Sequence, residues 1–183
     1  MYEARITFDD GPGPYTAEIL AVLERHHLRA TFFVNGNKVI EYAQLLRGAV
    51  ADGHTIGNHS WDHADFAALD DSAIDLQLSR TNAVLTRVLG KPPTLFRPPF
   101  GYVDNRVVKI AVRLGLESVM WDVDCEDWKR PGVEFIAGRV AGAKRGEIVL
   151  LHDGGLTERS QTVAGLDLGI ARALAMQEAG THT

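Results

Sequence analysis

The stretch that decides the fold is Ala4-Arg5-Ile6-Thr7-Phe8-Asp9-Asp10-Gly11-Pro12-Gly13-Pro14. Its apolar and β-branched residues predict a strand over residues 4–8. The glycine and proline run at 11–14 ends that strand, because proline has no backbone N–H and both residue types favour turns. Asp9 and Asp10 are therefore expected directly after the first strand.

Short apolar runs alternate with helix-period segments along the rest of the chain. Further strands are expected at residues 30–34, 55–57, 95–96, 118–123 and 148–151, and helices at 16–27, 41–51, 72–89, 105–114, 133–143 and 161–178. This alternation is typical of an α/β fold on parallel strands, here a βα barrel or barrel-like sheet of roughly six or seven units. With 183 residues, the chain suits one domain with a sizeable core, and we assign 1–183 to it.

The composition excludes some classes of partner. Hydrophobic residues make up 45% of the chain and charged residues 23%, as in an ordinary globular protein. The net charge of −5 argues against nucleic acid, because phosphate binding needs a basic surface. No apolar run approaches the length of a membrane span, and the sequence shows no signal-peptide pattern. Cys125 is the single cysteine, so no intramolecular disulfide can form, and we interpret it as structural.

Side chains that can do chemistry follow several of the expected strands. Besides the aspartate pair, these are His59, His63, Arg97, Asp124 to Trp128, and His152-Asp153. In a βα barrel the reactive residues lie at the carboxyl ends of the strands. We therefore expect these side chains to converge on one face of the sheet.

The aspartate pair and two histidines indicate a metal site. Adjacent carboxylates repel each other unless a cation or an arginine compensates their charge. His59 and His63 are four residues apart, a spacing that lets both imidazoles hold one ion. Two histidines and one carboxylate are a common ligand set for zinc and other divalent metals, and they leave positions open for water and substrate.

Each of these features has a simpler explanation when it is taken singly. An aspartate pair before Gly-Pro suits an ordinary turn, and two histidines four apart occur by coincidence on many surfaces. Arg97 suits a loop salt bridge, and His152 suits a capped histidine of the core. Their shared position after separate strands favours one functional site over several unrelated features.

Five short motifs follow one another in the chain: Thr7-Phe8-Asp9-Asp10-Gly11-Pro12, His59-Ser60-x-x-His63, Arg97-Pro98-Pro99-Phe100-Gly101, Asp124-x-x-Asp127-Trp128 and Leu150-x-His152. In this order they resemble the motifs of the polysaccharide deacetylase family, carbohydrate esterase family 4, over essentially the whole chain. The resemblance implies a distorted (β/α) barrel of about seven strands. Family members usually finish with an aromatic strand after the last helix, and residues 178–183 show no such pattern.

The resemblance implies a divalent metal held by Asp10, His59 and His63. Zinc is the metal expected first, and cobalt, nickel or manganese also suit two histidines and one carboxylate. A bound divalent metal lowers the pKa of its water from about 15.7 to roughly 7 and polarises a carbonyl group. The donor set therefore fits hydrolysis of an acetyl group.

The resemblance also assigns catalytic roles. Asp9 is expected to be the general base that takes a proton from the activated water, and Arg97 is expected to keep Asp9 ionised. His152 is expected to be the general acid for the leaving amine, with Asp127 tuning its protonation. These roles agree with general acid–base chemistry, because an amine leaves poorly unless it is protonated.

The remaining motif positions are expected to bind substrate. The backbone amide of Phe100 would stabilise the oxyanion. Trp128 and Leu150 would enclose the acetyl methyl group. Tyr102 and Trp61 are expected to stack on sugar rings together with Trp128.

The expected function is metal-dependent hydrolysis of N-acetyl groups on a GlcNAc-containing polymer or oligosaccharide, such as chitin, a chitooligosaccharide or peptidoglycan. The same centre would serve an acetylxylan esterase, which removes O-acetyl groups. The alternatives of other classes are a non-catalytic carbohydrate-binding relative and a metal-free amidohydrolase, and the presence of Asp9, His152 and the metal set argues against both. The substrate class implies a secreted or cell-envelope protein, and we expect a monomer.

Overall fold

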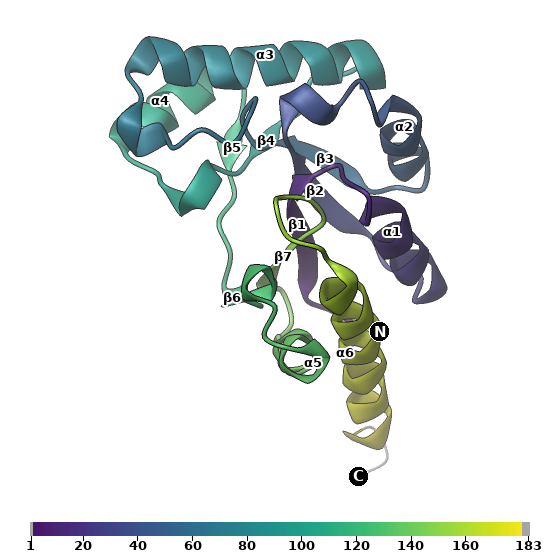
Figure 1. The fold of residues 1–183 in the computed structure, drawn as a ribbon. Coiled ribbons are helices and arrows are strands. Elements are labelled where there is room, and N and C mark those ends of the chain that lie inside the picture. The colour runs from purple at the N-terminus through teal and green to yellow at the C-terminus, as the bar shows by residue number, and fades with distance from the viewer. Residues whose placement is uncertain (1, 181–183) are drawn as a thin grey trace. The chain divides into compact units, whose positions relative to one another are not determined.

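The strands of the sheet are the feature that positions the site. The computed structural model, drawn in Figure 1, describes residues 2–180. In this range the strands are β1 (Arg5–Gly11), β2 (Ala30–Val34), β3 (Thr55–Asn58), β4 (Leu95–Phe96), β5 (Glu117–Ser118), β6 (Val123–Asp124) and β7 (Ile148–His152). They form one 7-stranded sheet in the order β5-β4-β3-β2-β1-β7-β6. The pairs β1–β7, β3–β4, β4–β5 and β6–β7 are parallel, as expected from the alternating pattern.

Helices alternate with the strands. They are α1 (Thr16–Arg25), α2 (Ala43–Ala51), α3 (Asp71–Leu89), α4 (Asn105–Arg113), α5 (Val133–Ala141) and α6 (Ser160–Gly180). Within the described residues, a helix follows every strand except β5, which leads directly to β6. None of these helices combines the length and the apolar character that a membrane span requires.

Two expectations about the strands need correction. β1 continues to Gly11, so Asp9 and Asp10 belong to the strand and do not follow it. The single strand expected at 118–123 is two strands, β5 and β6, at opposite ends of the strand order. The reason lies between them, where the carbonyl groups of Val119 and Met120 accept hydrogen bonds from the side chain of Arg97. These carbonyls therefore have a side-chain donor in place of a neighbouring strand.

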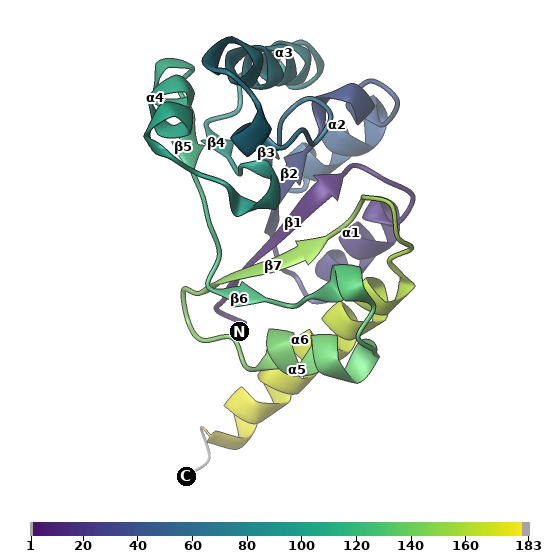
Figure 2. The same cartoon turned by 60° about the vertical axis from the view of Figure 1, so that its left-hand side comes forward.

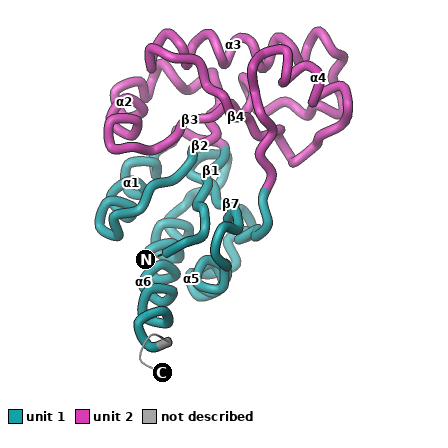
Figure 3. The backbone as a smooth tube through the Cα atoms, turned by 180° about the vertical axis from the view of Figure 1, so that it is seen from behind, with its two compact units in different colours: residues 1–9, 14–31, 121–183 teal, residues 10–13, 32–120 magenta. Residues whose placement is uncertain are grey.

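The chain divides into two compact units, coloured separately in Figure 3. Unit 1 comprises Met1–Asp9, Pro14–Thr31 and Trp121–Thr183, and unit 2 comprises Asp10–Gly13 and Phe32–Met120. The boundary thus crosses β1 between the two neighbouring aspartates. Of the tail at 178–183, where no closing aromatic strand was expected, residues 181–183 lie outside the described part of the chain.

Unit 1 contains residues 5–9 of β1, the strands β7 and β6, and the helices α5 and α6, which run beside each other in Figure 2. β1 and β7 pair in a register that sets Phe8 opposite Leu151 and Asp9 opposite His152. Phe8 and Leu151 are fully buried, so the apolar residues of both strands anchor this register. The register places the aspartate and the histidine at the same carboxyl edge.

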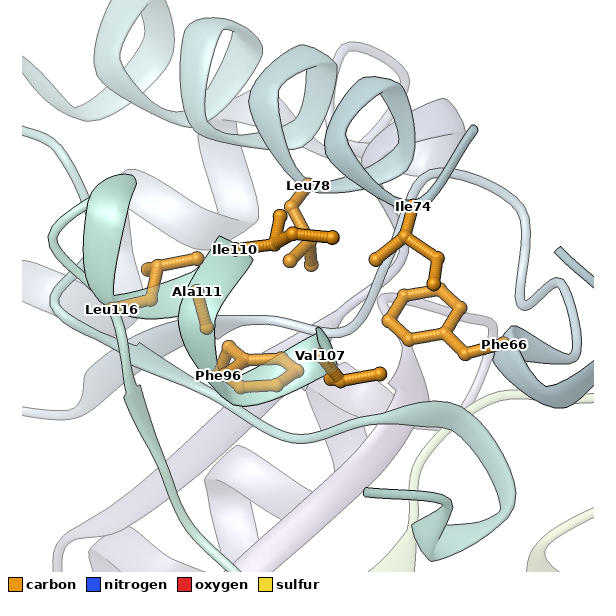
Figure 4. Close-up of a cluster of buried hydrophobic side chains, with 8 residues drawn as sticks. All are labelled: Phe66, Ile74, Leu78, Phe96, Val107, Ile110, Ala111 and Leu116. Atoms are coloured by element: carbon orange, nitrogen blue, oxygen red, sulfur yellow. The ribbon is translucent and has the colours of Figure 1, made fainter. Parts of the chain in front are cut away.

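Unit 2 has its own hydrophobic core beneath α3 and α4. Figure 4 shows this cluster, which consists of Phe66, Ile74, Leu78, Phe96, Val107, Ile110, Ala111 and Leu116. Phe96 is the last residue of β4 and has no exposed surface. Its burial fixes the point at which the chain leaves β4, and the next residue is Arg97.

Candidate active site

Asp10, His59 and His63 lie together in unit 2. One ligand atom from each of the three residues lies within 4.8 Å of the others. The Oδ1 atom of Asp10 is 3.4 Å from Nε2 of His59 and 3.1 Å from Nε2 of His63. The structure therefore brings together the three residues that the sequence predicted as metal ligands.

The tautomer of His59 favours a cation at this position. Its Nδ1 atom lies 2.7 Å from the backbone carbonyl oxygen of Arg97. A carbonyl oxygen can only accept, so Nδ1 carries a proton, and in the neutral imidazole Nε2 then presents its lone pair toward Asp10. A lone pair and a carboxylate oxygen that face each other form an electron-rich pocket. A divalent metal ion fits this pocket because it attracts both atoms.

The turn that follows β3 holds His63 in place. The amide of Ser60 donates to Oδ1 of Asn58 at 2.8 Å, and the Ser60 hydroxyl oxygen accepts from the amide of His63 at 2.9 Å. Asp10, Ser60 and His63 have φ values of 71°, 71° and 64°. Such left-handed conformations are uncommon for residues other than glycine and often mark functional sites.

Arg97 is buried without exposed surface and is tied to its own unit. Its Nε atom donates to the carbonyl of Val119 at 2.9 Å and Nη2 to that of Met120 at 3.0 Å. Its guanidinium carbon lies 4.4 Å from the centre of the Phe33 ring. The expected pairing of Arg97 with Asp9, which belongs to unit 1, stays a prediction.

Phe100 combines a strained backbone with an exposed ring. Its φ is 56°, its residue surface is 70% exposed, and its ring meets His63 edge to face with centroids 4.6 Å apart. Tyr102 lies two residues later, packs against the core cluster of unit 2 and donates its hydroxyl to Asp104 at 3.1 Å. The Phe100 ring thus covers one side of a predicted metal ligand, while Tyr102 is partly committed to the core.

His152 and Asp127 form a second group, which lies in unit 1. Nδ1 of His152 is 2.7 Å from Oδ1 of Asp127, and the backbone amide of His152 donates to Oδ2 at 3.0 Å. Burial would raise the pKa of Asp127, but hydrogen bonds from His152 and Thr162 and the charges of His152 and Arg159 lower it below the ordinary aspartate value. An ionised Asp127 keeps a proton on Nδ1 of His152, and Nε2 is then the nitrogen that can exchange protons with a substrate.

The other predicted residues of unit 1 lie on the strands β1 and β7 or next to Asp127 in the chain. Asp9 is opposite His152 in the strand register and is only 4% exposed. Leu150 is buried within β7, where its carbonyl accepts from the amide of Cys125. Trp128 directly follows Asp127 and is 48% exposed, and the Lys129 ammonium lies over its ring, 4.9 Å from the centroid.

Sequence reasoning missed the residues that support these groups. Thr162 donates its hydroxyl to Oδ2 of Asp127 at 2.7 Å. Arg159 is 2% exposed and donates from Nε to the carbonyl of Gly154 at 2.8 Å. Thr162 lies in the first turn of α6 and Arg159 directly before that helix. Helix periodicity gives no sign there of a polar contact to another element. Only their distance in space to Asp127 reveals them.

Together, the parallel sheet and the Asp-His-His cluster at its carboxyl edge define an α/β protein with a candidate metal centre. The chain belongs to the polysaccharide deacetylase family, whose model matches residues 3–119. The motif around Asp127 and the motif around His152 lie beyond that matched range, so the match is independent of them. The family expected from the sequence motifs is confirmed.

Individual relatives and solved structures agree with this membership. A peptidoglycan-N-acetylglucosamine deacetylase of Bacillus cereus is 42% identical over 165 residues, which cover 88% of this chain and 76% of the relative. A chitooligosaccharide deacetylase of Rhizobium leguminosarum bv. trifolii is 40% identical over 151 residues, covering 81% and 70%. A solved family 4 carbohydrate esterase from Streptomyces lividans, in complex with acetate, matches with a TM-score of 0.88 at 32% identity and covers 96% of this chain and 88% of its own. The structural match confirms the expected (β/α) fold.

Proposed function

We propose that this protein hydrolyses N-acetyl groups on the N-acetylglucosamine units of a polysaccharide or oligosaccharide. The observation that carries the proposal is the cluster of Asp10, His59 and His63, with the tautomer of His59 fixed for metal binding. Two similar relatives are named for the deacetylation of peptidoglycan N-acetylglucosamine and of chitooligosaccharides, which supports this substrate class. Such polymers lie outside the cytoplasm, and we infer that the protein acts there.

In this proposal Asp10, His59 and His63 hold a divalent metal, zinc first. When bound, such a metal supplies Lewis acidity toward the acetyl carbonyl and makes a water molecule more acidic. The contact between His59 and the Arg97 carbonyl orients the imidazole before any ion arrives. The chain thus offers a preformed set of three donors and leaves the remaining positions to water and substrate.

The two proton transfers are assigned to Asp9 and His152, with Arg97 and Phe100 in supporting roles. Asp9 takes a proton from the attacking water, and Arg97 balances the charge of that carboxylate. His152 gives a proton to the leaving amine from Nε2, because Asp127 holds the proton on Nδ1. The backbone amide of Phe100 donates to the oxygen on which negative charge develops.

The acetyl group and the sugar are bound by the remaining motif residues. Leu150 and Trp128 enclose the methyl group, which admits acetate and rejects longer acyl chains. The exposed ring of Trp128, and Tyr102 and Trp61, offer faces on which sugar rings can stack. Arg80 already covers one face of Trp61, with its guanidinium carbon 3.9 Å from the ring centroid, so a sugar cannot stack on that face while Arg80 stays in place.

Acetate release decides between this function and its alternatives. The zinc-loaded protein would be incubated with chitooligosaccharides, peptidoglycan and acetylated xylan, with and without a chelator. We expect acetate from a GlcNAc-containing substrate, and none after chelation or in Asp10→Ala. Glu41→Ala, which removes an exposed carboxylate of the same unit outside the cluster, serves as the matched control and keeps the activity.

The other outcomes are equally informative. Acetate from xylan alone would make the protein an esterase that uses the same centre. Full activity of Asp10→Ala, or full activity after complete chelation, would contradict the assigned metal site. Metal binding without acetate release from any of the three substrates would favour a carbohydrate-binding role.

A further inference from the structure

The Asp127 carboxylate has a third donor that the catalytic roles above leave unused. Besides two contacts from His152, its Oδ2 atom accepts the hydroxyl proton of Thr162 at 2.7 Å. Thr162 is 1% exposed and Asp127 is 1% exposed, so water cannot readily replace this donor. A buried carboxylate that loses a donor keeps its desolvation penalty without compensation.

We infer that Thr162 is a positioning residue of the proposed reaction: its hydroxyl holds the Asp127 carboxylate in the orientation in which that carboxylate fixes the imidazole of His152. The inference rests on the proposed function, because it assigns Thr162 a part in the proton transfer by His152. All the contacts that carry it lie within unit 1.

The direction of the Thr162 hydrogen bond selects one protonation state of Asp127. A hydroxyl that donates to Oδ2 stabilises the ionised carboxylate, which has only acceptor atoms. The first turn of α6 adds to this effect, because the partial positive charge of a helix N-terminus favours a nearby anion. Asp127 can then accept the Nδ1 proton of His152.

Few other charged or titratable groups face this carboxylate. His152 approaches it from β7, and Arg159, from the loop before α6, contributes a positive charge. Cys125 precedes it on the segment after β6, and burial raises the pKa of that thiol, so it stays protonated and neutral. The ionised state of Asp127 thus depends on His152, Arg159 and the Thr162 hydroxyl.

The ionisation of Asp127 gives a test that needs no substrate. The pKa of the Asp127 carboxyl group would be measured in the wild type, Thr162→Val and Thr162→Ser. The NMR signal of its carboxyl carbon would be followed as the pH is changed. Valine has the shape of threonine without the hydroxyl, so we expect the pKa of Asp127 to rise by roughly one unit. Serine keeps the hydroxyl and is expected to restore the wild-type value. An unchanged pKa in Thr162→Val would overturn the inference.

The kinetic test asks whether Thr162 acts through Asp127. We expect Thr162→Val to lower kcat on a chitooligosaccharide roughly tenfold with KM unchanged, and Thr162→Ser to restore kcat. In an Asp127→Asn background, adding Thr162→Val should change kcat by less than about twofold, because the partner of the hydroxyl has already been altered. An equal loss in both backgrounds would show a general structural effect and overturn the inference. A wild-type protein that releases no acetate would contradict the proposed function, while the carboxyl titration would still decide the role of Thr162.

Discussion

At the scale of single residues, the site depends on side chains that hold other side chains. The Ser60 hydroxyl holds His63 by accepting a hydrogen bond from its backbone amide. The backbone amide of Ser60 in turn donates to the side chain of Asn58. Asn58 is anchored in turn to the carbonyl of Leu78 at 2.9 Å and to the side chain of Asn82 at 2.8 Å. The position of a predicted metal ligand is therefore fixed by a chain of hydrogen bonds that ends in α3.

This chain of contacts predicts that Ser60 controls metal affinity without touching the metal. Ser60→Ala removes the acceptor for the His63 amide, and we expect the dissociation constant for zinc to rise about tenfold. Competition with a chromogenic chelator would measure it. Ser79→Ala, at a partly exposed serine of α3, is the matched control and should bind zinc like the wild type. Equal affinity in both variants would show that the turn holds His63 without Ser60.

The residues that sequence reasoning found and those that it missed differ in a physical way. Asp10, His59 and His63 carry chemistry in their own side chains, so residue type and spacing predicted a shared site of two histidines and one carboxylate. The family resemblance then selected Asp10 as that carboxylate. Thr162 has an ordinary helical side chain, and its importance comes from a partner 35 positions away in the sequence. Such a partner is known only after the fold has brought the two residues together.

At the scale of elements, α5 and α6 pack closely because glycines leave room. A Cβ atom added at Gly169 would lie 2.6 Å from Cβ of Val140 and 2.9 Å from the carbonyl oxygen of Ala137. A Cβ added at Gly165 would lie 2.6 Å from the side chain of Ile136. Two glycines one helical turn apart thus form the contact face of α6 toward α5.

This packing predicts opposite effects for two similar substitutions. Gly169→Ala should lower the free energy of unfolding by about 1–3 kcal/mol, because α5 must move away from the new methyl group. Gly138→Ala, on α5 with nothing within 4 Å of the added Cβ, should raise it by about 0.5–1 kcal/mol through better helix propensity. Urea denaturation followed by circular dichroism would measure both values. A Gly169→Ala protein as stable as Gly138→Ala would contradict the close packing described here.

The elements themselves were largely predictable, and the largest error has an identifiable origin. The strands at 30–34 and 95–96 follow from their apolar residues. The ends of α3 at Leu89 and of β4 at Phe96 follow from the glycine and the prolines that come after them. The single strand expected at 118–123 was wrong because residues 119–121 are all apolar and look like the middle of a strand. The carbonyls of Val119 and Met120 instead bind the side chain of Arg97, which directly follows β4 and leaves no mark on the local sequence.

At the scale of the whole molecule, the predicted functions divide between the two units. The predicted metal ligands Asp10, His59 and His63 all belong to unit 2, and the pair of Asp127 and His152 belongs to unit 1. Metal binding and proton donation therefore have separate structural supports. They should also be separable by mutation.

We expect His152→Gln to abolish acetate release while leaving the zinc dissociation constant within about twofold of wild type. Asp10→Ala should lose both properties, because the metal is required for the reaction as proposed. Isothermal titration with zinc and an acetate assay on the same preparations would compare the two variants. A large loss of zinc affinity in His152→Gln would show that the two groups depend on each other.

The contact between His59 and the carbonyl of Arg97 has a consequence for how this site can change over evolution. Because the acceptor belongs to the main chain, replacement of the arginine side chain leaves it in place. The proline pair that follows, Pro98-Pro99, restricts the peptide that carries this oxygen. A substitution at position 97 that keeps this backbone therefore keeps the acceptor that orients His59. The cost of such a substitution falls elsewhere, on the Val119 and Met120 carbonyls that lose the guanidinium donors.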